Sequence, residues 1–134
     1  MGINRFHNIM RFLRFDDANT RSQRKKEDKE APIRDLRIML NANLSQMYKP
    51  MENLTTNEQL YPYRGRTAFT QYLPSKPAKY GIKIWWICDA ENAYPLHGII
   101  YTGKINNTRE TNQGEIGKRI SSSLPRKWKK YLHG

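Results

Sequence analysis

The side chains of this chain with the clearest chemical use are cations placed to bind phosphate. Five of them occur close together in the middle of the sequence: Arg64, Arg66, Lys76, Lys79 and Lys83. Such cations neutralise phosphates and release counterions, which gives affinity for nucleic acid without reading its sequence. The alternative interpretation is a basic sheet edge that only contacts solvent, and both interpretations stay open from the sequence alone.

A second basic group lies near the C-terminus and consists of Arg126, Lys127, Lys129 and Lys130. It is interleaved with Trp128 and Tyr131, and basic residues alternating with aromatic ones can follow a single nucleic-acid strand by charge and base stacking. Trp128 also belongs to an apolar four-residue repeat. The alternative is therefore a helix that buries Trp128 and leaves its cations in solvent.

The overall composition favours the same kind of partner. Lys and Arg number 24 against 12 Asp and Glu, which gives a formal charge of +12, and a surplus of this size favours polyanions such as DNA. Cys88 is the one cysteine, so we expect no intrachain disulfide, no cysteine-based zinc site and a reducing compartment. Arg5, Arg11 and Arg14 interrupt the apolar N-terminus, so we expect neither a signal peptide nor a membrane partner.

Two helices are predicted ahead of the central cations. Apolar residues recur at three- and four-residue steps over residues 3–15, which predicts an amphipathic helix. Residues 15–32 contain almost no apolar side chains, so we predict an exposed linker or a solvated helical turn. A second helical repeat begins at Pro32 and ends before Pro50.

Strands are predicted from residue 53 onward, where the apolar period changes to two. Residues 53–60 predict a first strand, 79–90 a strand covered on both faces, and 94–103 the return strand of a hairpin. Residues 61–79, rich in Pro, Gly and Tyr, predict a structured loop. A four-residue apolar repeat over 116–132 predicts a closing helix that Pro125 kinks.

These elements predict a mixed α/β fold with two regions. Residues 1–50 form a helical N-terminal region, and residues 51–134 hold three consecutive antiparallel strands and a C-terminal helix.

Several runs of the sequence resemble the piggyBac transposase family, and they follow one another in the same order. They are RFLRFDDANTRSQRKKEDKEAPIRDL and NEQLYPYRGRTAFTQYLPSKPAKYGIKIWWICDAENAYPLHGIIYTGK, in which RGR, SKPAKYGIKIW and YTGK are the densest motifs. The resemblance implies that residues 51–134 are a truncated, incomplete RNase H-like core. It also implies that residues 1–50 belong to the end of a dimerisation and DNA-binding region, and that the protein is nuclear.

In that family a DDE-type triad of aspartates holds two divalent metal ions, such as Mg²⁺, for phosphoryl transfer. The resemblance places the first aspartate at Asn57, within Asn57-Glu58-Gln59-Leu60, and places the other two beyond Gly134. An amide brings no charge to a metal, and strand alternation points Glu58 to the opposite face. Asp89 ends a predicted strand and is interpreted as a turn residue. We therefore expect no productive metal site and no catalysis.

Three functional hypotheses follow. The first is a transposase-derived, catalytically inactive protein with weak, non-specific DNA binding. The second is a homodimer, or a dimerising inhibitor of a full-length relative, that acts through the N-terminal helices. The third is a decayed fragment without function. Salt dependence of DNA binding distinguishes the first from the others, and co-purification with a relative identifies the second.

Overall fold

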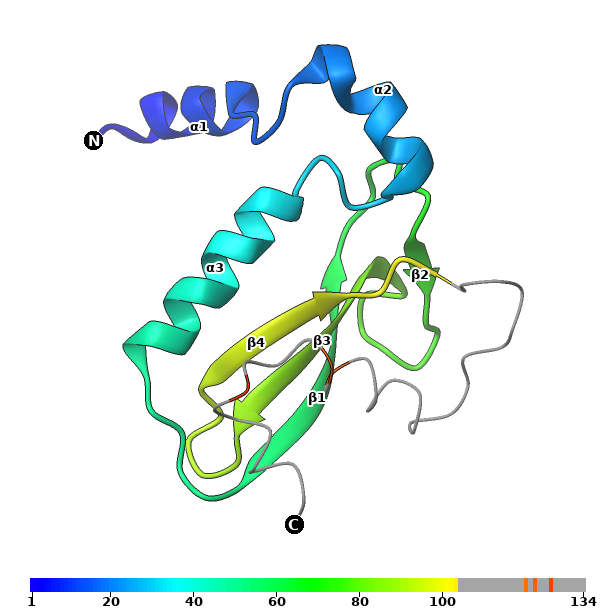
Figure 1. Cartoon of the computed structure of the whole chain (residues 1–134). Coiled ribbons are helices and arrows are strands. Elements are labelled where there is room, and N and C mark those ends of the chain that lie inside the picture. Colours follow the sequence, from blue (N-terminus) through cyan, green and yellow to red (C-terminus); the bar gives the residue numbers. More distant parts are fainter. Residues whose placement is uncertain (104–119, 121, 123–125, 127–134) are drawn as a thin grey trace. The chain divides into compact units, whose positions relative to one another are not determined.

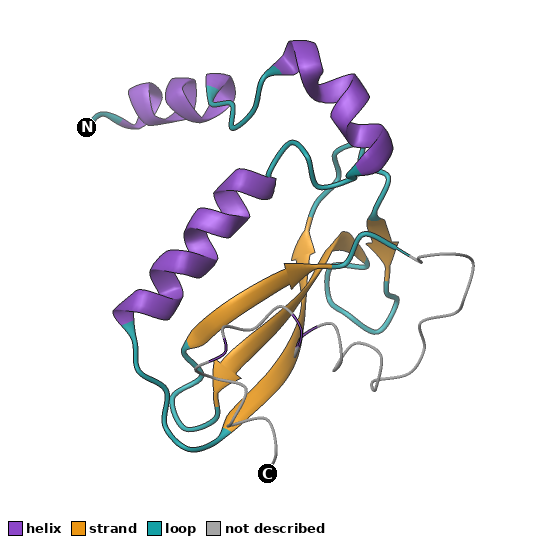
Figure 2. Ribbon diagram, in the orientation of Figure 1, coloured by secondary structure: helices purple, strands orange, loops and turns teal. Residues whose placement is uncertain are grey.

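The structure is a computed structural model that describes residues 1–103, 120, 122 and 126 (Figure 1). The chain divides into two compact units, residues 1–38 and residues 39–134, and each is considered by itself. Helices make up the first unit, and an antiparallel sheet dominates the second (Figure 2). The predicted mixed fold of helices and antiparallel strands is confirmed.

Helix α1 (Ile3–Phe12) confirms the first predicted helix, although it ends three residues earlier than expected. The N–H of Leu13 bonds the carbonyl of Ile9 and closes the last turn. None of the residues of α1 is buried, and Phe12 is 71% exposed. No described residue therefore buries the apolar face of α1.

Helix α2 (Ala18–Glu27) occupies most of the segment predicted as a linker or a solvated helical turn. It is ten residues long and buries none of them, so the solvated helical alternative is the correct one. The carboxylate of Asp17 accepts the N–H of Asn19 and caps the helix. Three cations in the last turn oppose the negative end of the helix dipole.

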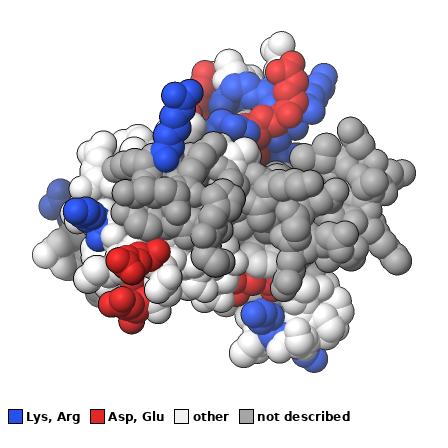
Figure 3. All heavy atoms as spheres, turned by 60° about the horizontal axis from the view of Figure 1, so that its bottom comes forward, with Lys and Arg blue, Asp and Glu red and all other residues white. Residues whose placement is uncertain are grey.

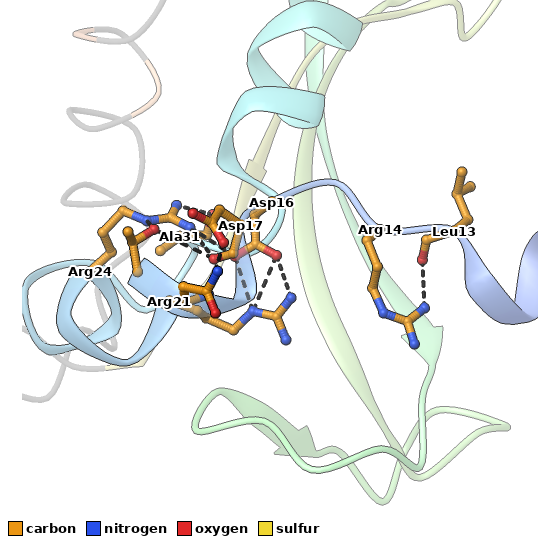
Figure 4. Close-up of polar contacts among 9 residues, drawn as sticks. Leu13, Arg14, Asp16, Asp17, Arg21, Arg24 and Ala31 are labelled. Carbon is orange, nitrogen blue, oxygen red and sulfur yellow. Dashed lines mark hydrogen bonds and ion pairs between the residues drawn. The ribbon is translucent and has the colours of Figure 1, made fainter.

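Asp16 holds the start of α2 by two ion pairs (Figure 4). Its carboxylate accepts hydrogen bonds from Arg21 and, at 3.0 Å, from Arg24. The hydrogen bond and charge of Arg21, supported by Arg24, lower the pKa of Asp16 against the opposing effect of burial. Arg24 also donates to the backbone carbonyls of Asp17 and Ala31, so one guanidinium joins both ends of the helix.

Helix α3 (Arg34–Met47) confirms the helix predicted between Pro32 and Pro50, and it contains the boundary between the two units. Ion pairs again order its start, where Arg34 contacts Asp28 and Arg37 contacts Glu30 at 2.8 Å.

The sheet has four antiparallel strands centred on β3. They are β1 (Leu54–Pro62), β2 (Thr70–Tyr72), β3 (Tyr80–Asp89) and β4 (Pro95–Ile100). Strand β1 pairs with β3 along one edge, whereas β2 and β4 pair with successive parts of the other edge (Figure 2). The three predicted strands are confirmed as β1, β3 and β4. The prediction of an all-loop segment over 61–79 missed β2.

The core lies where the second half of β3 meets β4. Ile87 and Leu96 are at most 1% exposed and pack with Ile120. Ile87, Cys88 and Asp89 are all buried, so this end of β3 is covered on both faces as predicted. Ile120 falls within the predicted C-terminal helix, most of which lies outside the described residues.

Asn41 fixes α3 to the outer edge of β4. Its amide donates to the carbonyl of Gly98 at 2.9 Å and accepts the N–H of Gly98 at 2.8 Å. Asn41 is also the one buried residue of α3. A Cβ at position 98 would lie 2.5 Å from the ring of Trp86, so only glycine fits this close approach.

Candidate nucleic-acid interface

The RGR motif lies in the connection between β1 and β2 and borders a hollow of about 480 Å³. The lining residues are Tyr63, Arg64, Gly65, Arg66, Thr67, Thr70 and Tyr80. The N–H of Tyr63 bonds the carbonyl of Tyr80, and the hydroxyls of Thr67 and Thr70 lie 2.7 Å apart. Phe69 is 5% exposed and anchors the connection in the protein. The loop therefore has a defined shape.

Arg64 and Arg66 are exposed, and neither forms an ion pair with any acidic residue in the described part of the chain. Between them, Gly65 leaves space that the ring of Tyr63 fills, since a Cβ there would lie 2.3 Å from the Tyr63 hydroxyl oxygen. The structure thus brings two predicted cations together beside an aromatic ring.

Lys76 and Lys79 lie in the turn between β2 and β3. The N–H of Leu73 donates to the carbonyl of Lys79 at 2.8 Å, and the N–H of Lys76 donates to the carbonyl of Leu73 at 3.1 Å. Lys79 is exposed and has no acidic partner among the described residues. Lys79 directly precedes Tyr80, which borders the hollow.

Lys83 has different surroundings from the other predicted cations. Its ammonium lies 2.7 Å from a carboxylate oxygen of Glu58 and 4.7 Å from the ring of Trp85. Its side chain is 16% exposed, and Lys76 approaches the same carboxylate at 4.0 Å. Glu58 therefore offsets part of the positive charge of both lysines. The ammonium of Lys83 is less accessible to a ligand than that of Lys76.

The second predicted group is described in part. Arg126 is exposed, whereas Lys127, Lys129 and Lys130 lie outside the described residues. On the face shown in Figure 3, the Lys and Arg atoms of the described residues form separate groups with Asp and Glu atoms near several of them. What sets Arg64 and Arg66 apart is that both line the same hollow, and neither is paired with an acidic residue in the described part of the chain.

Asn57 is exposed on β1, opposite Trp86 on β3. It borders a second hollow, of about 340 Å³, together with Gln59, Trp86 and Cys88 among others. The indole N–H of Trp86 donates to the side-chain oxygen of Gln59 at 2.8 Å. Burial raises the pKa of the Cys88 thiol, so the neutral form is favoured there.

Strand alternation puts Glu58 on the sheet face away from Asn57, as the apolar period predicted. Glu58 lies opposite Trp85 in the register and uses its carboxylate on Lys83. Its carboxylate is therefore engaged away from the Asn57 side chain.

Asp89 confirms its interpretation as a turn residue and does more than the sequence indicated. Fully buried, it accepts hydrogen bonds from the backbone N–H groups of Met51, Glu91 and Asn92 and from the hydroxyl of Tyr48. The Met51 bond is the main cause that lowers the pKa of Asp89, and burial opposes it. Asp89 thus ties the segment before β1 to the β3–β4 turn.

The described residues lack two further kinds of feature. Their His, Cys, Asp and Glu side chains form no group of three or more that could hold a metal ion. None of their helices is long and apolar enough to cross a membrane.

Comparison with known proteins defines the class of this chain. A family model described as Transposase IS4 matches residues 1–129, so the chain belongs to this transposase family. A cryo-EM structure of a piggyBac transposase synaptic complex with hairpin DNA is similar over 90% of this chain, at 36% sequence identity and a TM-score of 0.76. The match spans 25% of that transposase chain. The resemblance to piggyBac transposases is therefore confirmed.

Proposed function

We propose that this chain is a nuclear, transposase-derived module that binds DNA weakly and without sequence preference, and that it does not itself catalyse phosphoryl transfer. The observation that carries the proposal is the pair of exposed guanidiniums of Arg64 and Arg66, which have no acidic partner among the described residues. Guanidiniums of this kind bind phosphate oxygens in bidentate geometry. Lys79 adds a third accessible cation on the neighbouring turn.

The similar transposase supports DNA as the polyanion, because that protein was solved in a complex with DNA. The surplus of 24 basic over 12 acidic residues favours the same partner. A nuclear location is part of this proposal, because it brings the chain to chromosomal DNA.

The donor set around Asn57 supports the catalytic part of the proposal, since it does not fit a pair of Mg²⁺ ions. Mg²⁺ selects charged oxygen ligands, and Asn57 offers a neutral amide oxygen. The neighbouring carboxylate of Glu58 is engaged by Lys83 at 2.7 Å, and the side chain of Gln59 accepts from Trp86.

The test is DNA binding by fluorescence anisotropy with a 20-base-pair duplex across a salt series. We expect affinity to fall steeply with salt. The plot of log binding constant against log salt concentration has a negative slope, and the double variant Arg64→Gln/Arg66→Gln should make that slope shallower by about 2, since each lost phosphate contact removes about 0.9. The matched control is Lys25→Gln/Lys26→Gln, which removes the same charge from exposed positions on α2.

No binding at low salt, or binding that salt leaves unchanged, contradicts the proposal. Equal losses in both double variants would mean that net charge, and not the RGR loop, determines affinity. A wild-type chain that shows no cooperative thermal transition would favour the decayed-fragment hypothesis.

The exposed apolar residues of α1 favour a second candidate, association with a second copy or with a full-length relative. Ile3 and Phe12 are 70% and 71% exposed, and Phe6 and Ile9 are close to half exposed. Co-purification with a full-length relative tests this candidate. The variant Phe6→Gln/Ile9→Gln should abolish co-purification, and retention of the complex would exclude α1 as the contact.

A further inference from the structure

Exposed tyrosines gather around the RGR hollow. Tyr63 and Tyr80 line it and are 37% and 55% exposed, and Tyr72 on β2 is 54% exposed. Tyr72 lies directly opposite Tyr80 in the β2–β3 register, with ring centroids 4.8 Å apart. Tyrosine presents a large aromatic surface together with a polar tip, which suits a surface that binds a partly polar ligand.

Each ring contacts a neighbouring residue. Gly65 gives space to the Tyr63 ring, and the backbone bond from Tyr63 to the Tyr80 carbonyl holds the two residues on adjacent segments. The ring of Tyr80 makes a tilted contact with the ring of Tyr72. Rings that are already ordered lose little conformational entropy when a ligand packs on them.

The hollow combines these aromatic rings with positive charge. Its volume of about 480 Å³ is within the range of roughly 300–1,000 Å³ typical of sites for small organic molecules. Among the described residues, its lining contains two arginines and no acidic side chain. A ligand that matches both features has a flat aromatic part and an anionic part.

A nucleotide has these two parts, but a base inside a duplex has both faces covered by neighbouring bases. Only an unpaired nucleotide can offer a base face to a tyrosine while its phosphate contacts an arginine. Phosphate contacts alone, in contrast, do not favour a single strand, because the duplex has the higher charge density and releases more counterions per contact.

We propose that the hollow binds an unpaired nucleotide of single-stranded DNA, with the base stacked on Tyr63 or Tyr80 and the phosphates on Arg64 and Arg66. This inference rests on the proposed DNA-binding function and specifies the form of DNA that the site prefers. The chain accordingly binds a single strand more tightly than a duplex of equal length.

The experiment measures anisotropy at one fixed salt concentration with three labelled ligands. They are a 20-nucleotide oligo-dT strand, an abasic strand with the same number of phosphates, and a 20-base-pair duplex. The abasic strand keeps the charge and removes the bases, so its difference from oligo-dT reports stacking alone. We expect oligo-dT to bind about tenfold more tightly than the abasic strand, as a stacked base typically provides.

Three variants locate the effect. Tyr63→Leu and Tyr80→Leu should each weaken oligo-dT binding several-fold and leave abasic-strand binding unchanged, whereas Tyr80→Phe should retain wild-type affinity. The matched control is Tyr61→Leu, because Tyr61 is 58% exposed but does not line the hollow. Thermal melting of each variant confirms that it is folded.

The outcomes separate this inference from the function on which it rests. Equal affinity for oligo-dT, the abasic strand and the duplex overturns the unpaired-nucleotide site and leaves non-specific DNA binding intact. Absence of binding to all three ligands overturns both. A 20-nucleotide oligo-U RNA strand, measured as a fourth ligand under the same conditions, tests the assignment to DNA, and tighter binding of that strand than of oligo-dT overturns it.

Discussion

Residues 1–38 and residues 39–134 are ordered by different interactions. In the first unit, α1 and α2 bury no residue, and the acidic side chains of Asp16, Asp28 and Glu30 pair with arginines. In the second, Ile87 and Leu96 are buried, and the backbone of β3 is hydrogen-bonded to β1 on one side and to β4 on the other. Charge orders one region and apolar burial orders the other, so they should respond differently to mutation, salt and pH.

The largest effect is expected from Leu96→Ala in the core. Leu96 is fully buried against Ile87 and Ile120, so removing its side chain leaves a cavity and should lower the free energy of unfolding by about 3 kcal/mol. Urea denaturation followed by tryptophan fluorescence measures it. The matched control Leu13→Ala, at a residue 40% exposed in the first unit, should change stability by less than about 0.5 kcal/mol.

A smaller effect in the same unit is expected from Asn41→Ala. This change leaves both backbone groups of Gly98 without their side-chain partner and should cost about 1–3 kcal/mol. The control is Asn43→Ala, which changes the same residue type at an exposed position on the same helix. Equal urea midpoints for the two variants would show that the Asn41 bonds do not stabilise the fold.

Acid should destabilise the second unit through Asp89. The pKa of Asp89 is lower in the folded state than in the unfolded chain, where it is about 3.9. The stabilisation from the ionised carboxylate is therefore complete at pH values above the unfolded-state pKa, and it is lost as pH falls through the folded-state pKa. Tryptophan-detected urea midpoints between pH 7 and pH 3 measure this loss. Asp89→Asn should be less stable at pH 7 and should vary less with pH, whereas Glu91→Gln should follow the wild type.

The smallest effect is expected from Asp16→Asn, and it should stay within the first unit. The change removes the charge that pairs with Arg21 and Arg24, so the N-terminal part of α2 should fray while the sheet is unaffected. Backbone amide chemical shifts of residues 18–27 report the fraying. At 1 M salt, where the Debye length is about 3 Å, the difference from wild type should shrink. Fraying of equal size in Glu27→Gln, at an exposed residue, would contradict a specific role of Asp16.

The sequence predicted most elements because their signals are local. Apolar periods of three to four identified α1 and α3, and a period of two identified β1 and correctly separated Asn57 from Glu58. An apolar run covered on both faces identified β3, and the short turn after it identified β4 as the return strand of a hairpin. The helix α2 was less certain because its order comes from ion pairs and a cap and not from an apolar stripe.

The remaining features depend on partners that are distant in the sequence. Strand β2 has three residues and forms because β3 is beside it, so no local period marks it. Asn41 and Gly98 are 57 positions apart, and Asp89 meets Met51 across 38. Likewise, the pattern of cations identified Arg64 and Lys83 equally. Only the pairing of β1 with β3, which brings the Glu58 carboxylate within 2.7 Å of Lys83, shows that Lys83 is ion-paired.

The bond between Asn41 and Gly98 also sets the direction in which the sheet can grow. An additional strand beside β4 would need the donor and acceptor of Gly98, and the Asn41 amide already uses both. Strand β1 pairs with β3 on one side and, within the described residues, with no strand on the other. A side-chain amide therefore occupies the β4 edge of the sheet at Gly98, whereas the nine residues of β1 offer an edge where another segment can be added.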